Sequence, residues 1–224
     1  MKLLIIIISE KMDNIFIPHI ENLKKYMDKL EQNGSIIDYA GISSYNDFSN
    51  YESIVKFNYK QINIKKQLSK LCDFINTNPD LQYDWYVKIR PEVYLLDELP
   101  FHTLSKFSIN SRARNYEGSK NIIYGLSVGG KGVWNYITDA VVYNPTKETV
   151  VAMDDQIFIF HHNIIKSNGF ISKLNGYELQ NETTHTDLFN YNKIPLNVIG
   201  INLKFDRLNG LFCFSGNIVS NLNN

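Results

Sequence analysis

Residues 83–92 read Tyr83-Asp84-Trp85-Tyr86-Val87-Lys88-Ile89-Arg90-Pro91-Glu92, and the rest of the chain is interpreted around them. The aromatic and β-branched residues at the start of this stretch favour a half-buried strand. Proline lacks the backbone N–H that a sheet ladder needs, so Pro91 is expected to end the strand. Arg90 and Glu92 are therefore predicted to lie where a central strand passes into a loop.

The side chains of Arg90 and Glu92 are of the kinds that bind a diphosphate and a metal. A guanidinium grips phosphate oxygens through two parallel hydrogen bonds. A carboxylate two residues away can hold a divalent cation that bridges the same oxygens. Ligands of open α/β sheets bind at the carboxyl ends of the strands. The competing interpretation is a solvated surface ion pair, which a short motif alone does not exclude.

The N-terminal part of the chain predicts a βαβ unit. Residues 3–8 are continuously aliphatic, as in a strand covered on both faces. Residues 18–32 carry apolar side chains at helical spacing, and Asn33-Gly34 supplies a stop signal. Residues 35–40 form a second predicted strand. This order implies a parallel neighbour joined by a right-handed crossover.

The order of elements up to residue 89 is typical of a nucleotide-binding α/β half. Residues 43–51 are polar and are predicted to form a loop at the ligand edge of the sheet. A helix is predicted over residues 61–77, with Gln61 and Gln67 on it, and Asn78-Pro79 ends it. The predicted fold class is a single Rossmann-like α/β domain with a mostly parallel central sheet flanked by helices.

A second informative stretch runs from Met153 to His162 and begins with the adjacent acids Asp154 and Asp155. Paired carboxylates repel one another unless they are solvated, bind a metal or differ in protonation. The structural alternative is a helix N-terminus, where aspartate is favoured, and both interpretations can hold together. His161 and His162 should point to different faces, one packed and one exposed.

Composition excludes some function classes. The 224 residues contain 23 Lys and Arg against 23 Asp and Glu, so no basic field invites nucleic acid or an anionic membrane. Cys72 and Cys213 form no metal motif or disulfide framework. The glycines of residues 125–132 lack the P-loop pattern and indicate a connection. Residues 3–8 are too short to span a bilayer, and a soluble, cytoplasmic protein is expected.

Several of these motifs together resemble a known family. They are the 83–92 stretch, Met153-Asp154-Asp155-Gln156-Ile157-Phe158-Ile159, Glu182, and Leu203 followed four residues later by Arg207. The chain resembles the WavE-like glycosyltransferases, a GT-A-type group connected with surface-glycan synthesis that also occurs in large DNA viruses. The resemblance covers residues 2–207. It implies a GT-A-like domain over residues 1–210, a tail over residues 211–224, and host cytoplasm if the protein is viral.

The resemblance also implies roles for particular residues. Arg90, with Lys88, Gln61 and Gln67, would bind a nucleotide-sugar donor. Glu92 would bind Mn²⁺ or Mg²⁺, although the family carries aspartate there and the longer arm alters the geometry of an octahedral site. Asp155 or Asp154 would be the general base that activates the hydroxyl of a glycan or protein-glycan acceptor.

Two other functions remain open at this stage. One is a non-catalytic protein that binds nucleotide-sugars or carbohydrates on the same fold. The other is a metal-dependent phosphoesterase, which also uses clustered acids, although the chain lacks a well-spaced His/Asp cluster. The sequence does not name the sugar, the nucleotide, the acceptor, the stereochemical course or the oligomeric state.

Overall fold

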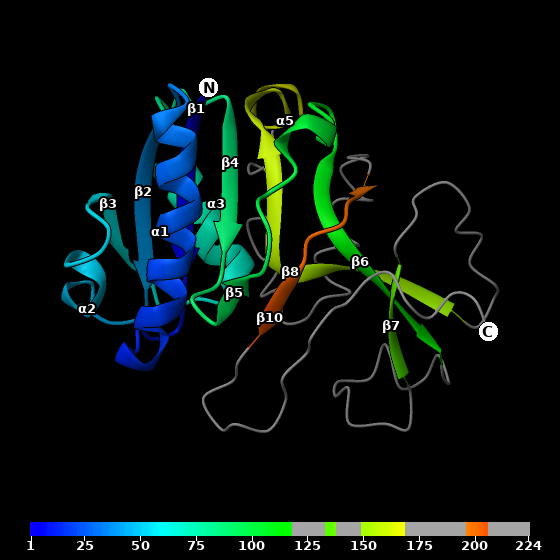
Figure 1. Cartoon of the computed structure of the whole chain (residues 1–224), viewed down its shortest axis with the longest axis horizontal. Coiled ribbons are helices and arrows are strands. Elements are labelled where there is room, and N and C mark those ends of the chain that lie inside the picture. Colours follow the sequence, from blue (N-terminus) through cyan, green and yellow to red (C-terminus); the bar gives the residue numbers. More distant parts are fainter. Residues whose placement is uncertain (118–132, 138–148, 169–195, 206–224) are drawn as a thin grey trace.

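The computed structural model describes residues 1–117, 133–137, 149–168 and 196–205, which form a twisted sheet with helices on both faces (Figure 1). In chain order the elements are β1 (Lys2–Ile8), η1 (Asn14–Phe16), α1 (Ile17–Gln32), β2 (Ile36–Ser43), α2 (Ser49–Glu52), β3 (Phe57–Ile62), α3 (Gln67–Thr77), β4 (Trp85–Ile89), β5 (Val93–Leu95), η2 (Phe101–Thr103), β6 (Ile109–Glu117), β7 (Val133–Ile137), β8 (Thr149–His161), α5 (His162–Asn168), β9 (Leu196–Val198) and β10 (Leu203–Phe205).

The main sheet has the strand order β3-β2-β1-β4-β8-β6-β7, and β9 pairs with β6. Strands β3, β2, β1 and β4 are parallel neighbours. β8 runs antiparallel to both β4 and β6, while β9 is parallel to β6. β5 and β10 form a separate antiparallel pair. The predicted fold class, α/β with a mostly parallel central sheet flanked by helices, is confirmed.

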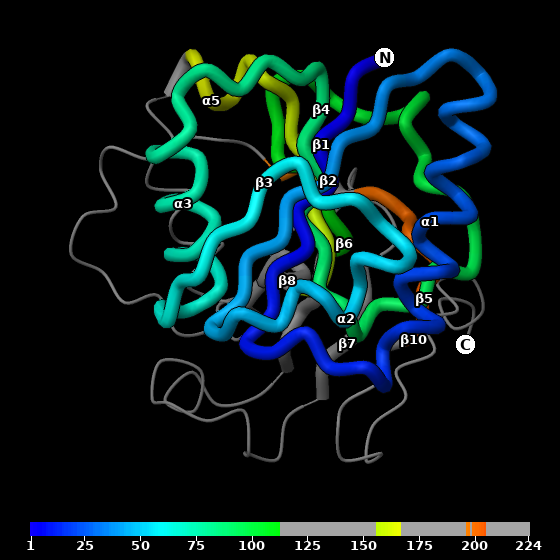
Figure 2. Tube along the Cα trace, turned by 90° about the vertical axis from the view of Figure 1, so that its left-hand side faces the viewer, coloured from blue at the N-terminus to red at the C-terminus, as the bar shows by residue number. Residues whose placement is uncertain are grey.

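β1 is covered on both faces, as its unbroken aliphatic sequence predicts. Every residue from Leu3 to Ile8 is fully buried. Leu3, Ile5 and Ile7 pack into the cluster that includes α1, while the alternate residues pack with α3. Figure 2 shows α1 and α3 on opposite sides of the sheet.

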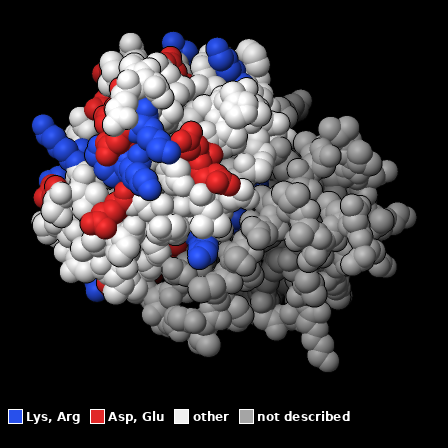
Figure 3. Space-filling view, in the orientation of Figure 1, with Lys and Arg blue, Asp and Glu red and all other residues white. Residues whose placement is uncertain are grey.

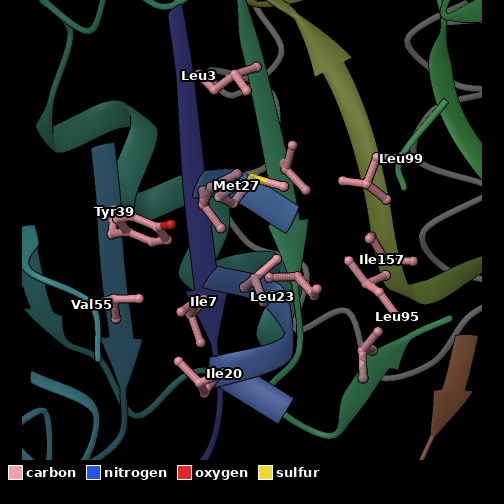
Figure 4. Packing of buried hydrophobic residues seen from close by; sticks show 14 of the residues in the cluster. Leu3, Ile7, Ile20, Leu23, Met27, Tyr39, Val55, Leu95, Leu99 and Ile157 are labelled. Carbon is pink, nitrogen blue, oxygen red and sulfur yellow. The ribbon is translucent and has the colours of Figure 1, made fainter. Parts of the chain in front are cut away.

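α1 follows its predicted pattern closely. Its buried face includes Ile20, Leu23 and Met27, which lie against β1 and β4 in Figure 4. Gly34 follows the helix with φ +83°, a conformation that glycine adopts without steric cost. The long helix therefore lies where the sequence predicts it. The hydrophobic cluster beneath it also includes Leu95 of β5 and Ile157 of β8.

The predicted helix over residues 61–77 is wrong in its first turns. Gln61 lies on the strand β3, and α3 begins only at Gln67. Side chains of β3 alternate between the covered and the exposed face, which a strand requires, and Ile64 is 86% exposed instead of packed. Pairing with β2 decides the conformation here, because the apolar residues of this segment also fit a helical spacing.

Other boundaries also differ from the sequence prediction. β2 extends to Ser43, and the predicted loop over residues 43–51 contains the start of the short helix α2, with Phe48 and Tyr51 buried. Further along the chain, β6 covers residues 109–117, and residues 196–205 contain the two short strands β9 and β10. Several predictions lie outside the described residues: those on residues 125–132, Glu182, Arg207, Cys213 and the tail 211–224.

The α1 face of the molecule carries charges of both signs side by side (Figure 3). Lys24 pairs with Asp28 and Glu31, and Lys29 pairs with Glu98. This face therefore offers no field of a single sign. Within the described segments, no helix has the length and apolar character needed to cross a membrane.

The packing around Gly41 of β2 leaves no room for a larger side chain. A β-carbon there would lie 2.9 Å from a ring atom of Phe48 and 3.0 Å from one of Phe57. Gly41→Ala should lower the free energy of unfolding by about 1–3 kcal/mol, as overpacking of a rigid core does. Urea denaturation measures the change. Gly200→Ala is the control, since a β-carbon at Gly200 meets no atom within 4 Å. Equal stability of both variants would contradict the packing described.

Candidate functional site

The carboxyl ends of β3, β2, β1 and β4 lie at one edge of the sheet, because these strands are parallel. β1 leads through α1 to β2 on one side, whereas β4 lies on the other side of β1. The order in which strands are added to the sheet therefore reverses at β1. In open α/β sheets such a switch point leaves a crevice outside the strand ends, where ligands bind. The candidate site lies at this edge of the sheet, which is the lower edge in Figure 1.

Arg90, Pro91 and Glu92 form a turn directly after β4, as predicted. The backbone N–H of Val93 donates to the Arg90 carbonyl at 3.1 Å and closes the turn. The Arg90 guanidinium binds the Glu92 carboxylate through two contacts, Nη2 to Oε1 at 2.6 Å and Nε to Oε2 at 3.3 Å. Both side chains are mostly buried, with exposed fractions of 22% and 13%. The guanidinium N–H groups that could bind a phosphate are here bound to the Glu92 carboxylate.

The segment after β1 packs against this turn. Nδ1 of His19 lies 3.2 Å from the Pro91 carbonyl oxygen, which fixes the ring against the turn. Burial raises the pKa of the Tyr51 hydroxyl, and the negative charge of Glu92 adds to the increase. The Tyr51 hydroxyl donates to the Asp13 carbonyl at 2.9 Å, in the segment between β1 and α1. Neither His19 nor Tyr51 was singled out from the sequence, because a single ring in a predicted helix or loop gives no signal of such a contact.

β8 brings the second predicted stretch to the same edge. Its antiparallel pairing with β4 ends at Ile157 opposite Ile89, and one step further the Arg90 N–H donates to the Gln156 carbonyl at 3.0 Å. Asp154 and Asp155 precede Gln156 on β8, so their backbone lies within two residues of this contact with the Arg90 turn. The two stretches that the sequence analysis selected are therefore neighbours in the fold.

The strand is irregular at this point. On β6, Ser111 pairs with Phe158 and Ala113 with Met153, so residues 154–157 of β8 lie opposite the single residue Arg112. β8 bends sharply in Figure 1. Bulges of this kind redirect side chains and occur often beside active sites. The adjacent acids thus belong to a bulge at the carboxyl edge of β4.

The helix N-terminus considered for Asp154 and Asp155 is wrong, since both lie within β8. The strand pairs that precede and follow these residues, with β6 up to Met153 and with β4 from Ile157, hold the segment in β8 and outweigh the local preference of aspartate for a cap. His161 and His162 do point to opposite faces, the first against the Trp85 ring and the second to the Tyr86 hydroxyl at 3.0 Å. Both are partly buried, so the expectation of one exposed histidine is also wrong.

Lys88 and Gln67 are brought together, and Gln61 is not with them. Lys88 is 1% exposed, and its Nζ donates to Gln67 Oε1 at 2.9 Å. The same Nζ lies 5.5 Å from the centre of the Phe158 ring. Gln61 lies on β3, which β2 and β1 separate from β4. The prediction that both glutamines lie on one helix is therefore wrong: Gln67 lies on α3 and contacts Lys88, whereas Gln61 lies near the carboxyl end of β3.

Two buried charged residues at this edge, Arg112 and Lys70, were missed from the sequence. Arg112 is 1% exposed, and its Nη2 lies 3.4 Å from Gln156 Oε1. Lys70 is 2% exposed and donates to the Ser9 carbonyl and the Ser44 hydroxyl. A lysine in an amphipathic helix or an arginine in a strand is usually solvated, so sequence pattern gives no signal for their burial.

The described residues do not assemble a metal centre. Glu92 is the predicted ligand, and its carboxylate is bound by the Arg90 guanidinium. Within the part of the chain that the structure describes, no three His, Cys, Asp or Glu side chains gather as metal ligands. Mg²⁺ and Mn²⁺ require several oxygen ligands at regular angles, which this set does not supply. No chemical step is therefore assigned to a metal here.

The ion pair at the edge gives a testable prediction. Glu92→Gln leaves the mostly buried Arg90 guanidinium without its carboxylate and should cost about 1–3 kcal/mol of unfolding free energy. Glu98→Gln is the matched control, because its pair with Lys29 is exposed and should contribute little. Urea denaturation of both variants measures the difference. If Glu92→Gln is as stable as Glu98→Gln, the closed pair does not form in solution.

No protein-family model matches the chain, and no curated protein matches its sequence. Among solved structures it is similar to A197 from STIV, with 10% identity, a TM-score of 0.46, and coverage of 92% of this chain and 86% of that one. It is also similar to a putative glucose-1-phosphate thymidylyltransferase from Bacillus anthracis in complex with a sucrose, with 13% identity, a TM-score of 0.44, and coverage of 91% and 89%. At these values neither likeness carries an argument about family or function.

Proposed function

We propose that this protein is a glycosyltransferase that moves a sugar from a nucleotide-sugar donor to a glycan or protein-glycan acceptor. The donor diphosphate binds at the carboxyl edge of β1 and β4. Arg90, Lys88 and Gln67 contribute to this donor site, and Asp155 or Asp154 acts on the acceptor hydroxyl. The domain is GT-A-like in the sense that one α/β sheet provides both halves of the site.

The observation that carries the proposal is the hydrogen bond from the Arg90 N–H to the Gln156 carbonyl. It joins the Arg90 turn after β4 to the bulge that contains the adjacent acids. In glycosyl transfer, one group stabilises the leaving diphosphate and another activates the attacking hydroxyl. These two groups must lie about the length of one sugar apart. Arg90 and Gln156 are 66 residues apart in the sequence, and they meet beside the strand ends where open α/β sheets bind ligands.

The residue types suit the chemistry of glycosyl transfer. Negative charge develops on the leaving nucleoside diphosphate as the glycosidic bond breaks, and fixed cations stabilise it in a water-poor site. Lys88 is fully buried beside Gln67, so its charge acts through little solvent. An aspartate can accept the proton of the acceptor hydroxyl as the new bond forms.

A second function has one observation in its favour. The Arg90 fork is closed on Glu92, so the pair occupies the place where a metal and a diphosphate would otherwise be held. A protein that binds nucleotide-sugars or carbohydrates without turnover would tolerate this arrangement. The two functions differ in a single measurable property, since only the enzyme releases a nucleoside diphosphate when an acceptor is present.

Nucleotide binding is the first prediction of this function. UDP or GDP at about 100 times its dissociation constant should stabilise the fold by about 2.7 kcal/mol. For a chain of this size that is a rise of roughly 5–10 °C in the melting temperature. A thermal-shift titration of both nucleotides, with and without Mn²⁺, measures it. If neither nucleotide raises the melting temperature under either condition, the donor site does not exist.

Loss of the general base is the second prediction. Either Asp155→Asn or Asp154→Asn should reduce sugar transfer by roughly 10²- to 10⁴-fold, the usual contribution of general-base catalysis. Donor affinity should change little, because the base acts on the acceptor. Release of nucleoside diphosphate in the presence of a panel of glycan acceptors gives the rate, and calorimetry gives the affinity.

Asp80→Asn is the control for these variants, since Asp80 is exposed in the turn before β4 and should leave transfer unchanged. Two results would contradict the assignment of the base. One is full transfer by both aspartate variants. The other is a wild-type protein that binds donor and glycans but releases no nucleoside diphosphate, which would establish the non-catalytic alternative.

A further inference from the structure

The fully buried charges of the described residues are all positive. The fully buried charged side chains are Lys70, Lys88 and Arg112, whereas no described aspartate or glutamate side chain is fully buried. Because the chain as a whole has no net charge, this imbalance is local. A buried ammonium costs free energy unless a partner compensates it.

Lys70 is the clearest of the three. Its Nζ donates to the Ser9 carbonyl at 2.5 Å and to the Ser44 hydroxyl at 2.8 Å, both of which are neutral. Within the described segments it takes part in no ion pair. An ammonium has three donors, so these two contacts leave one for a further acceptor. Lys70 is thus a buried cation held in place by neutral oxygens.

The position of Lys70 is as informative as its contacts. Ser9 follows β1 and Ser44 follows β2, so the ammonium from α3 lies where the carboxyl ends of both strands meet. Gln67 lies one turn earlier on α3 and accepts from Lys88 of β4. The first turns of α3 therefore hold two buried ammonium groups at the ends of the neighbouring strands β1 and β4.

Desolvation supports the same interpretation. Burial lowers the pKa of the Lys70 ammonium, and the carboxylates of Glu10 and Asp47 offset part of this change from a distance. A purely structural contact to the Ser9 carbonyl could be made by a neutral donor at lower cost. A lysine at this position gives the site a positive charge that an anionic ligand would neutralise.

We propose that Lys70 is a binding residue for the diphosphate of the donor, together with Lys88 beneath the ends of β1 and β4. This inference rests on the proposed function, because it assigns the anionic part of the same ligand. The ammonium donates its third hydrogen to a phosphate oxygen while Ser9 and Ser44 keep it oriented. The chemical class recognised is a diphosphate, and no base or sugar is specified by this contact.

The test compares Lys70→Met with Lys66→Met. Lys66 is exposed beside the start of the same helix, so the same substitution there removes a charge outside the site. Calorimetric titration with UDP, GDP and inorganic pyrophosphate measures binding. A charge-assisted hydrogen bond lost from the site should weaken binding roughly 10- to 100-fold in Lys70→Met. Lys66→Met should bind like the wild type.

Two further variants keep the test decisive if Lys70→Met does not fold. Lys70→Gln retains a donor without the charge and should bind as weakly as Lys70→Met. Lys70→Arg retains the charge and should recover most of the affinity. A structural role alone would make glutamine and arginine equivalent, or would leave the affinity unchanged in every folded variant, and either result overturns the inference.

The outcomes separate this inference from the proposed function. If the wild type binds nucleotides and Lys70→Met binds them equally well, Lys70 is excluded and the donor site survives. If the wild type binds pyrophosphate but no nucleotide, and Lys70→Met loses it, the anion site stands and the nucleotide-sugar function fails. If the wild type binds none of the three probes, both are wrong.

Discussion

The antiparallel pairing of β8 with β4 is the constraint on which the site depends. It places the end of β4, where the chain turns at Pro91, against Gln156 of β8. The bulge opposite Arg112 includes residues 154–157, and β8 continues beyond it along β6. Without this pairing, the Arg90 turn and the adjacent acids would be distant segments with no common chemistry.

Charge is distributed unevenly between the interior and the surface. The α1 face carries lysines beside acids, and these pairs are solvated. At the carboxyl edge the fully buried Lys70 and Lys88 ammonium groups donate to a backbone carbonyl, a hydroxyl and an amide oxygen, whereas the mostly buried Glu92 carboxylate is paired with Arg90. The charges that act at this edge are therefore set by burial and local geometry more than by the net charge of the chain.

The parts of the fold that could be predicted from sequence are those set by local pattern. The buried strand β1, the helix α1 and the strand β4 with its proline stop all lie as their residues indicate. The segment around Gln61 was mispredicted because its apolar residues fit two periodicities, and only pairing with β2 selects the strand. The strand at Asp154 and Asp155 was likewise decided by distant partners. The burial of Lys70 and Arg112 depends on contacts that no local sequence pattern encodes.

We propose one site that combines the Arg90 turn, the ends of β1 and β4, and the β8 bulge. A crystal structure of the protein soaked with a UDP-sugar would test this proposal. We expect diphosphate density beside Arg90 and over the first turns of α3, with the sugar directed toward residues 154–155. Nucleotide density at the opposite edge of the sheet, near His161 and His162, would contradict it.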